Sequence, residues 1–504
     1  MTARKKTKTA DIPAPEVGVD RFGVIDIGSN SVRFVVFDSA MRSPAYFFNE
    51  KVYCGLGSDI ETTGALPPEG RARALATLRR FALLSGAMGV REVVTVATAA
   101  MRDATDGAEF AGEIARETGL KVRIVSGKDE GRFAALGVLL GDRRAEGLVV
   151  DIGGASMELA LVQADAVRHC TTTPLGPLRL METGRTGAHL DAYIDARIAD
   201  NLPDGTRTGL MMTLVGGGWR AFASLVMQRA DYPMHVLHGY EFTPEQAIET
   251  CDWIAAGGEG LDLTQYGLSR NRADNAPWTA HVLRALLKRL EPSRITVSSC
   301  GLREGVLYES LTPAMRGDDP LTQSAAVMER LLSRFPGFGV ELEKWCAPIL
   351  PEIPPRLRLA ACLLADVNWR VHPDYRAGAC FTTATQSSLV GLTHTERMIL
   401  AVSLAFRYKS AKQAVERNGG TKIIDKGTRR LAEGMGRIIR LGAMLSGATP
   451  ELLHDCPLAR DGDTLTLTIP ARLDSLKSEA VERRLAAAAS VLDLSPRMVT
   501  GGEE

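Results

Sequence analysis

The chain has 504 residues and a formal net charge of zero, with 45% hydrophobic and 24% charged residues. This length suits three or four domains, and the composition is that of a globular protein, which excludes global disorder. Because there is no net charge, any affinity for polyanions has to come from local clusters of basic residues. Eight cysteines without a CxxC pair predict reduced thiols in a cytoplasmic protein. No apolar run is long enough to predict a membrane span.

The N-terminal half of the chain reads as a tail followed by two blocks of alternating strands and helices. Residues 1–20 are basic but lack a following apolar stretch, so we expect a disordered basic tail and no secretion signal. The first block covers residues 21–142, with expected strands at 23–37, 45–56, 92–98 and 121–125 and expected helices at 68–88, 106–118 and 129–140. The second block covers residues 143–311, with expected strands at 148–152, 157–162, 211–215 and 294–298 and expected helices at 189–202, 220–230, 244–256 and 278–290.

The strand signal fades beyond residue 311. Proline, glycine and aspartate cluster in residues 311–320 and predict a linker. We expect a helical C-terminal domain at 320–504, with helices at 324–335, 355–369, 395–408, 426–445 and 478–492 and one strand at 464–469. Between residues 401 and 440, ten basic residues face three acidic ones. This excess favours a track for a polyanion, the alternative being a solvated helical face.

One short pattern occurs twice, far apart in the chain. Each copy is an apolar run, an aspartate (Asp26 or Asp151), a turn of small residues and a second apolar run, which predicts a β-hairpin. The two turns consist of Gly28, Ser29, Asn30 and Ser31, and of Gly153, Gly154, Ala155 and Ser156. Clustered backbone amides bind anions, and an aspartate beside them suits a hydrated divalent cation. Two copies therefore predict duplicated lobes that face each other across a phosphate-binding cleft.

Three further positions are candidates for the same cleft. Gly217 lies in a glycine loop between an expected strand and helix, a common anion site, although a plain turn is as good an interpretation. Arg102 follows the strand at 92–98 and reaches either the cleft or solvent. Ser126 and Asp129 fit a capping box, whereas Glu130 falls one position beyond it. A carboxylate there suits a general base, although the simpler reading is an acidic residue in the first helical turn.

Taken together, these segments resemble the exopolyphosphatase / guanosine pentaphosphatase (Ppx/GppA) phosphatase family, within the actin–sugar kinase–Hsp70 superfamily. The resemblance covers about residues 22–310 and rests on segments 26–33, 98–102, 126–131, 151–158, 272–274 and 299–306. It implies an α/β fold of two actin-like (ribonuclease H-like) lobes around a cleft, followed by a mainly α-helical C-terminal domain. One departure is Ala155, where the family commonly has a third glycine; alanine fits there if its φ is negative.

The resemblance also implies roles for single residues. Glu130 matches the general base that activates water. Asp151 and Glu158 match acidic positions that hold Mg²⁺ or another divalent cation, with Asp26 as a further contributor. Residues 28–31 and 153–156 match two phosphate loops, and Arg33 and Arg102 match cationic clamps. Some family members resemble metal-dependent HD phosphohydrolases in their C-terminal domain. Segment 363–367 here lacks the histidine of that motif, so we expect the domain to bind substrate or a partner subunit.

The expected function is an exopolyphosphatase that removes terminal orthophosphate from inorganic polyphosphate. The alternative within the family is hydrolysis of guanosine pentaphosphate, with guanosine penta- or tetraphosphate as ligands. A rival from another class is a nucleotide-switched binding protein like actin or Hsp70. Trp219 argues against the rival, because its ring is expected to crowd an adenine site. We further expect a cytoplasmic homodimer that binds neither membrane nor nucleic acid.

Overall fold

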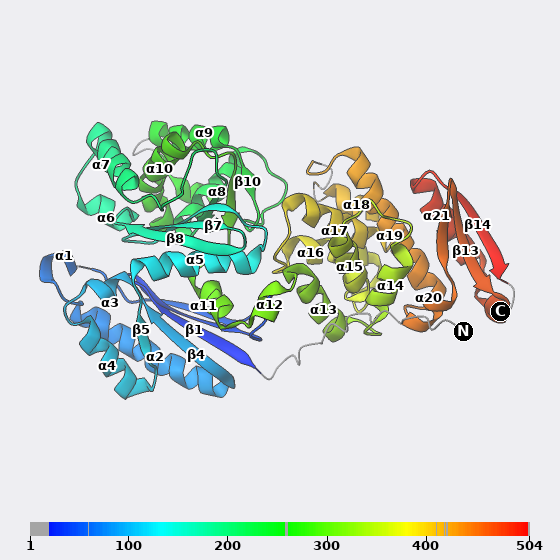
Figure 1. Ribbon diagram of the computed structural model, residues 1–504, viewed down its shortest axis with the longest axis horizontal. Coiled ribbons are helices and arrows are strands. Elements are labelled where there is room, and N and C mark those ends of the chain that lie inside the picture. Colours follow the sequence, from blue (N-terminus) through cyan, green and yellow to red (C-terminus); the bar gives the residue numbers. More distant parts are fainter. Residues whose placement is uncertain are drawn as a thin grey trace.

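The computed structural model describes residues 20–58, 60–257, 261–409, 411–417, 419 and 422–501. Apart from Asp20, the expected N-terminal tail lies outside these residues. Two sheets form the N-terminal part (Figure 1). The first has the order β3-β2-β1-β4-β5, with β1 (Arg21–Ile27), β2 (Ser31–Phe37), β3 (Tyr46–Tyr53), β4 (Val90–Ala97) and β5 (Val122–Ile124). The second has the order β10-β11-β9-β6-β7-β8, with β6 (Gly147–Ile152), β7 (Met157–Gln163), β8 (Ala166–Thr173), β9 (Met212–Val215), β10 (Glu241–Phe242) and β11 (Ile295–Ser298).

Helices cover the outer face of each sheet. Those of the first lobe are α1 (Ile60–Thr63), α2 (Pro68–Ala87), α3 (Ala99–Asp103) and α4 (Gly107–Thr118). Those of the second lobe are α6 (Pro177–Glu182), α7 (Gly187–Asp200), α8 (Gly217–Arg229), α9 (Pro244–Gly257), the 3₁₀ helix η2 (Leu263–Tyr266) and α10 (Arg270–Leu290). Each set buries apolar side chains of its own sheet in a separate core. The two expected α/β blocks are therefore present, each with a hairpin and parallel crossovers.

Two helices, α5 (Gly127–Gly141) and α11 (Leu302–Ser310), lie between the sheets (Figure 1). Their side chains share one core with residues of both sheets, such as Val24 and Val149. The helices cross closely because glycines stand at the contact. A Cβ on Gly305 would lie 1.8 Å from the Phe133 carbonyl oxygen, and one on Gly137 would lie 2.1 Å from that of Gly301. This crossing fixes how the lobes face each other.

Helix α10 begins earlier than expected. The sequence pattern predicts a helix only over residues 278–290. In the structure Pro277 lies inside the helix, which begins at Arg270. A proline inside a helix removes one amide donor and crowds the carbonyl four residues earlier, here that of Ala273, yet the helix continues through Pro277. The added turns carry Arg272 and Asn275 to the cleft described below.

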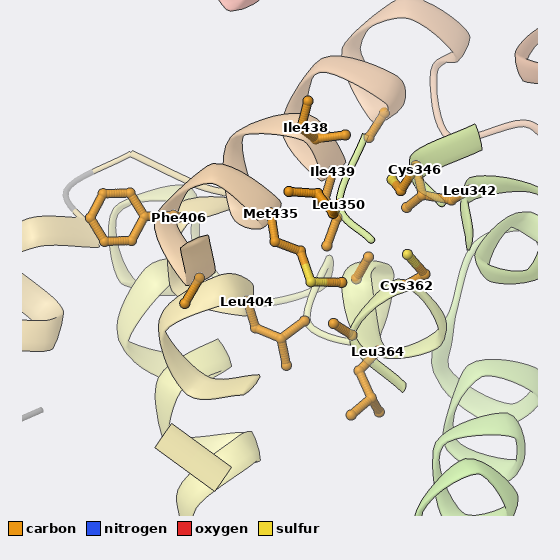
Figure 2. Packing of buried hydrophobic residues seen from close by; sticks show 14 of the residues in the cluster. Leu342, Cys346, Leu350, Cys362, Leu364, Leu404, Phe406, Met435, Ile438 and Ile439 are labelled. Atoms are coloured by element: carbon orange, nitrogen blue, oxygen red, sulfur yellow. The ribbon is translucent and has the colours of Figure 1, made fainter. Parts of the chain in front are cut away.

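The C-terminal part is mainly helical, as expected, with one small sheet (Figure 1). Its helices are α12 (Pro313–Gly317), α13 (Pro320–Leu332), α14 (Phe338–Cys346), α15 (Pro355–Leu363), η3 (Leu364–Asp366), η4 (Pro373–Tyr375), α16 (Arg376–Gln386), α17 (His394–Phe406), α18 (Ala411–Arg417), α19 (Lys426–Ser446), α20 (Pro450–Asp455), η5 (Ala471–Leu476) and α21 (Glu479–Val491). Strand β13 (Thr464–Pro470) matches the expected strand, whereas β12 (Leu458–Asp461) and β14 (Ser495–Gly501) were not anticipated. Figure 2 shows the core, in which Met435, Ile438 and Ile439 of α19 pack against α14, α15 and α17.

All eight cysteines are free thiols, and seven of them are buried, in accord with the absence of a disulfide pattern. Within the described residues, no helix is both long and apolar enough to cross a membrane. The segment expected as a linker contains the short helix α12, which follows a Thr312 cap. The C-terminal part therefore joins the second lobe through a structured connection.

Candidate functional site

The duplicated pattern forms two equivalent hairpins. Strands β1 and β2 meet in a turn in which the Gly28 amide donates to the Ser31 carbonyl oxygen at 3.0 Å. Strands β6 and β7 repeat it, with the Gly153 amide 2.9 Å from the Ser156 carbonyl oxygen. Both turns line the same cleft, so the lobes present the same backbone motif from two sides. Paired turns of this kind match the two anion-binding loops that the repeat predicts.

The residues that face each aspartate across the hairpins differ. Asp26 pairs with Arg33, whereas Asp151 pairs with Glu158. Residues directly opposite each other in antiparallel strands point to the same face, and like charges there repel. The first lobe therefore offers a balanced pair and the second lobe offers two carboxylates. A cation that neutralises facing carboxylates is therefore expected in the second lobe, next to Asp151 and Glu158.

The turns are held by the segments that follow them. The carbonyl oxygens of Ser29 and Asn30 accept hydrogen bonds from amides of residues 54–57, and those of Gly154 and Ala155 accept from residues 176–178. Ala155 is not among the residues with positive φ, so its methyl group is tolerated there. These hydrogen bonds fix the positions of both turns, as a preorganised binding site requires.

The cleft between the lobes has a volume of about 630 Å³. It is lined by every site residue expected from the sequence except Arg102: Asp26, Gly28, Ser29, Asn30, Ser31, Arg33, Glu130, Asp151, Gly153, Gly154, Ala155, Ser156, Glu158 and Gly217. The glycine loop contributes through Gly216, whose φ of +112° excludes most side chains. A Cβ there would lie 2.8 Å from the Asp151 carboxylate, so glycine lets α8 begin against that carboxylate.

Glu130 stands at the head of α5, one position past the expected capping box. Ser126 and Asp129 form that box through reciprocal hydrogen bonds, leaving Glu130 free of the capping role. Its carboxylate accepts a hydrogen bond from Arg102, which lies beside it and not among the cleft-lining residues. Burial raises the pKa of Glu130 to about 7, against the opposing effect of Arg102. A carboxylate with such a pKa can accept a proton near neutral pH.

The remaining carboxylates of the cleft also hold their protons more tightly than usual. Burial raises the pKa of Asp151 to about 6, and burial with neighbouring Glu130 and Asp151 raises the pKa of Glu158 well above its ordinary value. Burial likewise raises the pKa of Asp26, although Arg303 opposes this at 3.2 Å. Among the described residues no three metal-ligating side chains converge. The set therefore fits a hydrated divalent cation held by one or two carboxylates.

Four cationic residues of the cleft were not assigned a role from the sequence, although Arg272 and Arg303 lie in segments that carry the family resemblance. Lys51, Arg220, Arg272 and Arg303 all line it. Arg303 bonds Asp26, and Arg220 donates to the Ser299 carbonyl oxygen at 3.3 Å. Burial and the charge of Arg303 lower the pKa values of Arg220 and Arg33, so these guanidiniums form one repelling group. Such a group favours a multiply charged anion between them.

A sequence signal for three of these residues exists. Arg220, Arg272 and Arg303 stand near the N-termini of α8, α10 and α11. The helix dipole disfavours cations at that end, so an arginine there needs another reason. The arrangement suits a shared anion, because the helix N-termini and the guanidiniums attract the same charge. Buried Glu304 offsets part of the repulsion, and it accepts hydrogen bonds from Tyr46 and the Gly301 amide.

The expectation for Trp219 is wrong. Its side chain is fully buried in the core of the second lobe and does not line the cleft. The side chain belongs to the apolar core that α8 shares with the strands of the second sheet. The bulk of Trp219 therefore gives no argument against a nucleotide in the cleft.

Comparisons with known proteins agree with this geometry. The profile of the Ppx/GppA phosphatase family matches residues 35–314, and that of the exopolyphosphatase C-terminal domain matches residues 335–495. Retrograde regulation protein 2 of Saccharomyces cerevisiae is 25% identical over 433 residues, covering 77% of this chain and 72% of the yeast protein. Exopolyphosphatase 1 of Mycobacterium tuberculosis is 28% identical over 324 residues, covering 61% and 92%.

Two further comparisons extend the likeness. Guanosine-5'-triphosphate,3'-diphosphate pyrophosphatase of Vibrio vulnificus is 23% identical over 475 residues, covering 90% of this chain and 92% of that protein. The crystal structure of the Aquifex aeolicus Ppx/GppA family member is 25% identical with a TM-score of 0.52, covering 57% of this chain and 97% of that one. The expected fold of two actin-like lobes followed by a helical domain is thus confirmed.

Proposed function

Because the chain belongs to the Ppx/GppA phosphatase family and is therefore a phosphoanhydride hydrolase, we propose that it is an exopolyphosphatase. It removes terminal orthophosphate from linear inorganic polyphosphate. The observation that carries the proposal is the cleft itself, where two amide turns and a group of guanidiniums surround Glu130. The match of residues 335–495 to an exopolyphosphatase C-terminal domain favours this substrate.

In the proposed reaction each residue type has one task. Arg33, Arg220 and Arg303 hold the terminal phosphoryl group together with the turn amides. Glu130 orients a water molecule and takes its proton as the oxygen–phosphorus bond forms. The bond to the bridging oxygen then breaks, and the shortened chain leaves with that oxygen. Positioning and charge neutralisation supply most of the catalysis of phosphoryl transfer.

Asp151 and Glu158 are the residues that would hold Mg²⁺ or another divalent cation, with Asp26 close by. Such a cation supplies charge neutralisation at the phosphoryl oxygens. It also removes the repulsion between the facing carboxylates of β6 and β7. Both effects act on groups already in place, so no rearrangement of the hairpin is needed.

Replacing Asp151 by asparagine tests this assignment. The change should raise the half-saturating Mg²⁺ concentration for activity by about tenfold or more, because one carboxylate ligand loses its charge. The measurement is a Mg²⁺ titration of phosphate release. Asp165→Asn is the control, since Asp165 is exposed at the β7–β8 turn of the same lobe. An unchanged Mg²⁺ requirement in Asp151→Asn would leave that residue a structural role only.

Besides the expected role of Arg102 as a phosphate clamp, we propose that it keeps the pKa of Glu130 low enough for Glu130 to act as a base. Its guanidinium lowers the pKa of Glu130, so Arg102→Gln should raise that pKa. Since the base acts deprotonated, activity should fall most at low pH, by roughly tenfold at pH 6 relative to pH 9. The pH–rate profile measures this, with Arg102→Lys as the charge-retaining control. A uniform loss at all pH values would contradict tuning and support a clamp.

A second candidate function is hydrolysis of guanosine pentaphosphate. It is favoured by the Vibrio vulnificus relative, whose match covers 90% of this chain. A phosphate-release assay at equal terminal phosphate concentration separates the candidates, using long polyphosphate, guanosine pentaphosphate and ATP. Faster turnover of polyphosphate supports the proposal, and faster turnover of guanosine pentaphosphate supports the second candidate. Stable ATP binding without turnover of any substrate would favour a nucleotide-switched binding protein.

A further inference from the structure

Two arginines of the cleft depend on one tight turn at the end of β11. Residues 298–301 form this turn, and α11 begins directly after it with Arg303 as its second residue. The Ser298 hydroxyl closes the turn through two hydrogen bonds within it. The Ser299 carbonyl oxygen accepts the hydrogen bond from Arg220. The position of the 298–301 turn therefore affects where both guanidinium groups lie.

His238, in the loop between α8 and β10, holds this turn by its side chain. Its Nδ1 atom accepts a hydrogen bond from the Ser299 amide at 3.2 Å. The amide of the next residue, Gly239, donates to the Val297 carbonyl oxygen at 2.9 Å, so the same loop also holds the end of β11. Ser299 is thus bound on both sides, with its amide on His238 and its carbonyl oxygen on Arg220.

The hydrogen bond to Ser299 requires a neutral imidazole with its proton on Nε2. A backbone amide can only donate, so Nδ1 has to be the acceptor. Burial is the main cause that lowers the pKa of His238 to about 4, and the charges of Arg397 and His394 add to it. Asp142 opposes the shift. His238 is therefore neutral at neutral pH, and its acceptor is available to the turn.

Two helices contact the same histidine from other sides. Gly141, the last residue of α5, faces the ring, because a Cβ there would lie 3.0 Å from His238 Cε1. His394, the first residue of α17, has its Nε2 atom 3.3 Å from the His238 carbonyl oxygen and donates to it, since a carbonyl oxygen can only accept. The Nδ1 atom of His394 then accepts from the Tyr232 hydroxyl at 2.9 Å. His238 therefore joins α5, the 298–301 turn and the C-terminal part.

We propose that His238 is a positioning residue for the cleft, which holds Arg220 and Arg303 in place through the turn and connects that turn to the C-terminal part. His238 is not among the residues that line the cleft, so it acts through the turn alone. The role rests on the proposed function, in which Arg220 and Arg303 hold the terminal phosphoryl group. Binding groups need such support, because their own position is only as precise as that of the segments behind them.

The surroundings of His238 separate this role from plain packing. The residue is partly exposed and lies beside a cavity of about 70 Å³. A smaller side chain therefore gives up little packing there, whereas loss of the acceptor leaves the Ser299 amide without its hydrogen bond. A replacement that keeps the acceptor and one that only keeps the shape should thus behave differently.

The test compares His238→Leu with His238→Asn, two side chains of similar size and shape. The asparagine oxygen lies close to the place of Nδ1 and can accept from Ser299, whereas leucine has no acceptor. We expect His238→Leu to raise KM for polyphosphate by about tenfold and to leave kcat within about threefold, because ground state and transition state lose the same phosphate contacts. His238→Asn should stay close to the parent chain. Equal increases of KM in both variants, or none in either, would overturn the proposal.

A binding measurement separates this role from the proposed hydrolysis. Calorimetric titration with inorganic tripolyphosphate is done in Glu130→Gln, which suppresses turnover. Adding His238→Leu should weaken binding by about tenfold, and adding His238→Asn should weaken it by less than about threefold. This pattern in a chain that hydrolyses no phosphate substrate would leave the positioning role intact and refute the proposed function. Unchanged binding in a chain that hydrolyses polyphosphate would refute the positioning role alone. His238→Gln replaces the leucine variant if that one does not fold, because its amide group lies near the Nε2 position and misses Ser299.

The connection to the C-terminal part is tested at His394. His394→Gln keeps a donor for the His238 carbonyl oxygen, whereas His394→Leu does not. We expect His394→Leu to raise KM by about threefold and His394→Gln to change it little. Combined with His238→Leu, the effect of His394→Leu should be smaller than in the parent chain, because both act through the same turn. Full additivity of the two changes, or equal effects of His394→Gln and His394→Leu, would overturn the connection.

Discussion

Replacing Glu130 by glutamine is expected to leave the protein folded and to slow phosphate release by about 10²- to 10⁴-fold, the usual contribution of a general base. Glutamine keeps the size of the side chain and can still accept a hydrogen bond from Arg102, but it cannot take a proton from water. Substrate affinity should therefore change little. Steady-state kinetics on polyphosphate measure both quantities.

The matched control is Asp129→Asn, one residue earlier. Asp129 belongs to the capping box of α5 and does not line the cleft. Its replacement should cost some helix stability, about 1 kcal/mol, with little effect on turnover. Near-normal turnover in Glu130→Gln, or an equal loss in the two variants, would reduce Glu130 to one more acidic residue at a helix N-terminus.

Replacing Gly305 by alanine should be among the most destabilising single changes in the chain. The new Cβ would lie 1.8 Å from the Phe133 carbonyl oxygen, so α5 and α11 have to move apart. Overpacking against backbone cannot relax by a rotamer change, and we expect a loss of about 3 kcal/mol or more of unfolding free energy. Because α5 carries Glu130 and α11 carries Arg303, activity at permissive temperature should fall as well.

Gly86→Ala is the control for this prediction. Gly86 is also inside a helix, α2, but no atom lies within 4 Å of a Cβ placed there. Alanine should stabilise that helix slightly, by about 0.5 to 1 kcal/mol. Denaturant midpoints for both variants and the parent chain provide the comparison. A similar midpoint for Gly305→Ala and the parent chain would show that the crossing of α5 and α11 can loosen without cost.

Local patterns predicted the parts of the site that the chain builds locally. The two hairpin turns each lie within eight residues, and their spacing alone indicates a facing pair. Asp26 and Asp151 could be predicted together with the turns, because they directly precede them in the sequence. Lys51, Arg220 and Arg272 come from three separate elements, and only the tertiary fold brings them to the turns. The positions of Arg220 and Arg272 against the helix dipole are the signal that could have indicated them. Lys51 lies on strand β3 and has no such signal.

The errors in the fold have similar causes. The start of α10 was placed after Pro277, because local propensity weighed more than the two or so turns that tertiary packing stabilises. Strand β14 escaped notice because it is a largely exposed edge strand with a proline at its second position. Trp219 was placed in the cleft because a glycine loop does not reveal which way the following helix turns its side chains. In each case the missing information was a contact between distant segments.

The C-terminal part also touches both lobes. Ser324 of α13 meets Ser43 of the first lobe at 2.5 Å, while His394 and Lys422 bond Tyr232 and Asp231 of the second. A domain braced against both halves limits how far they can rotate about the α5–α11 crossing. Little binding energy is then spent on closing the two lobes, and the cleft is preorganised for its ligand. A polymer presents the same terminal group after every cleavage. Successive ends of one chain can therefore bind in a preorganised cleft without the lobes opening between turnovers.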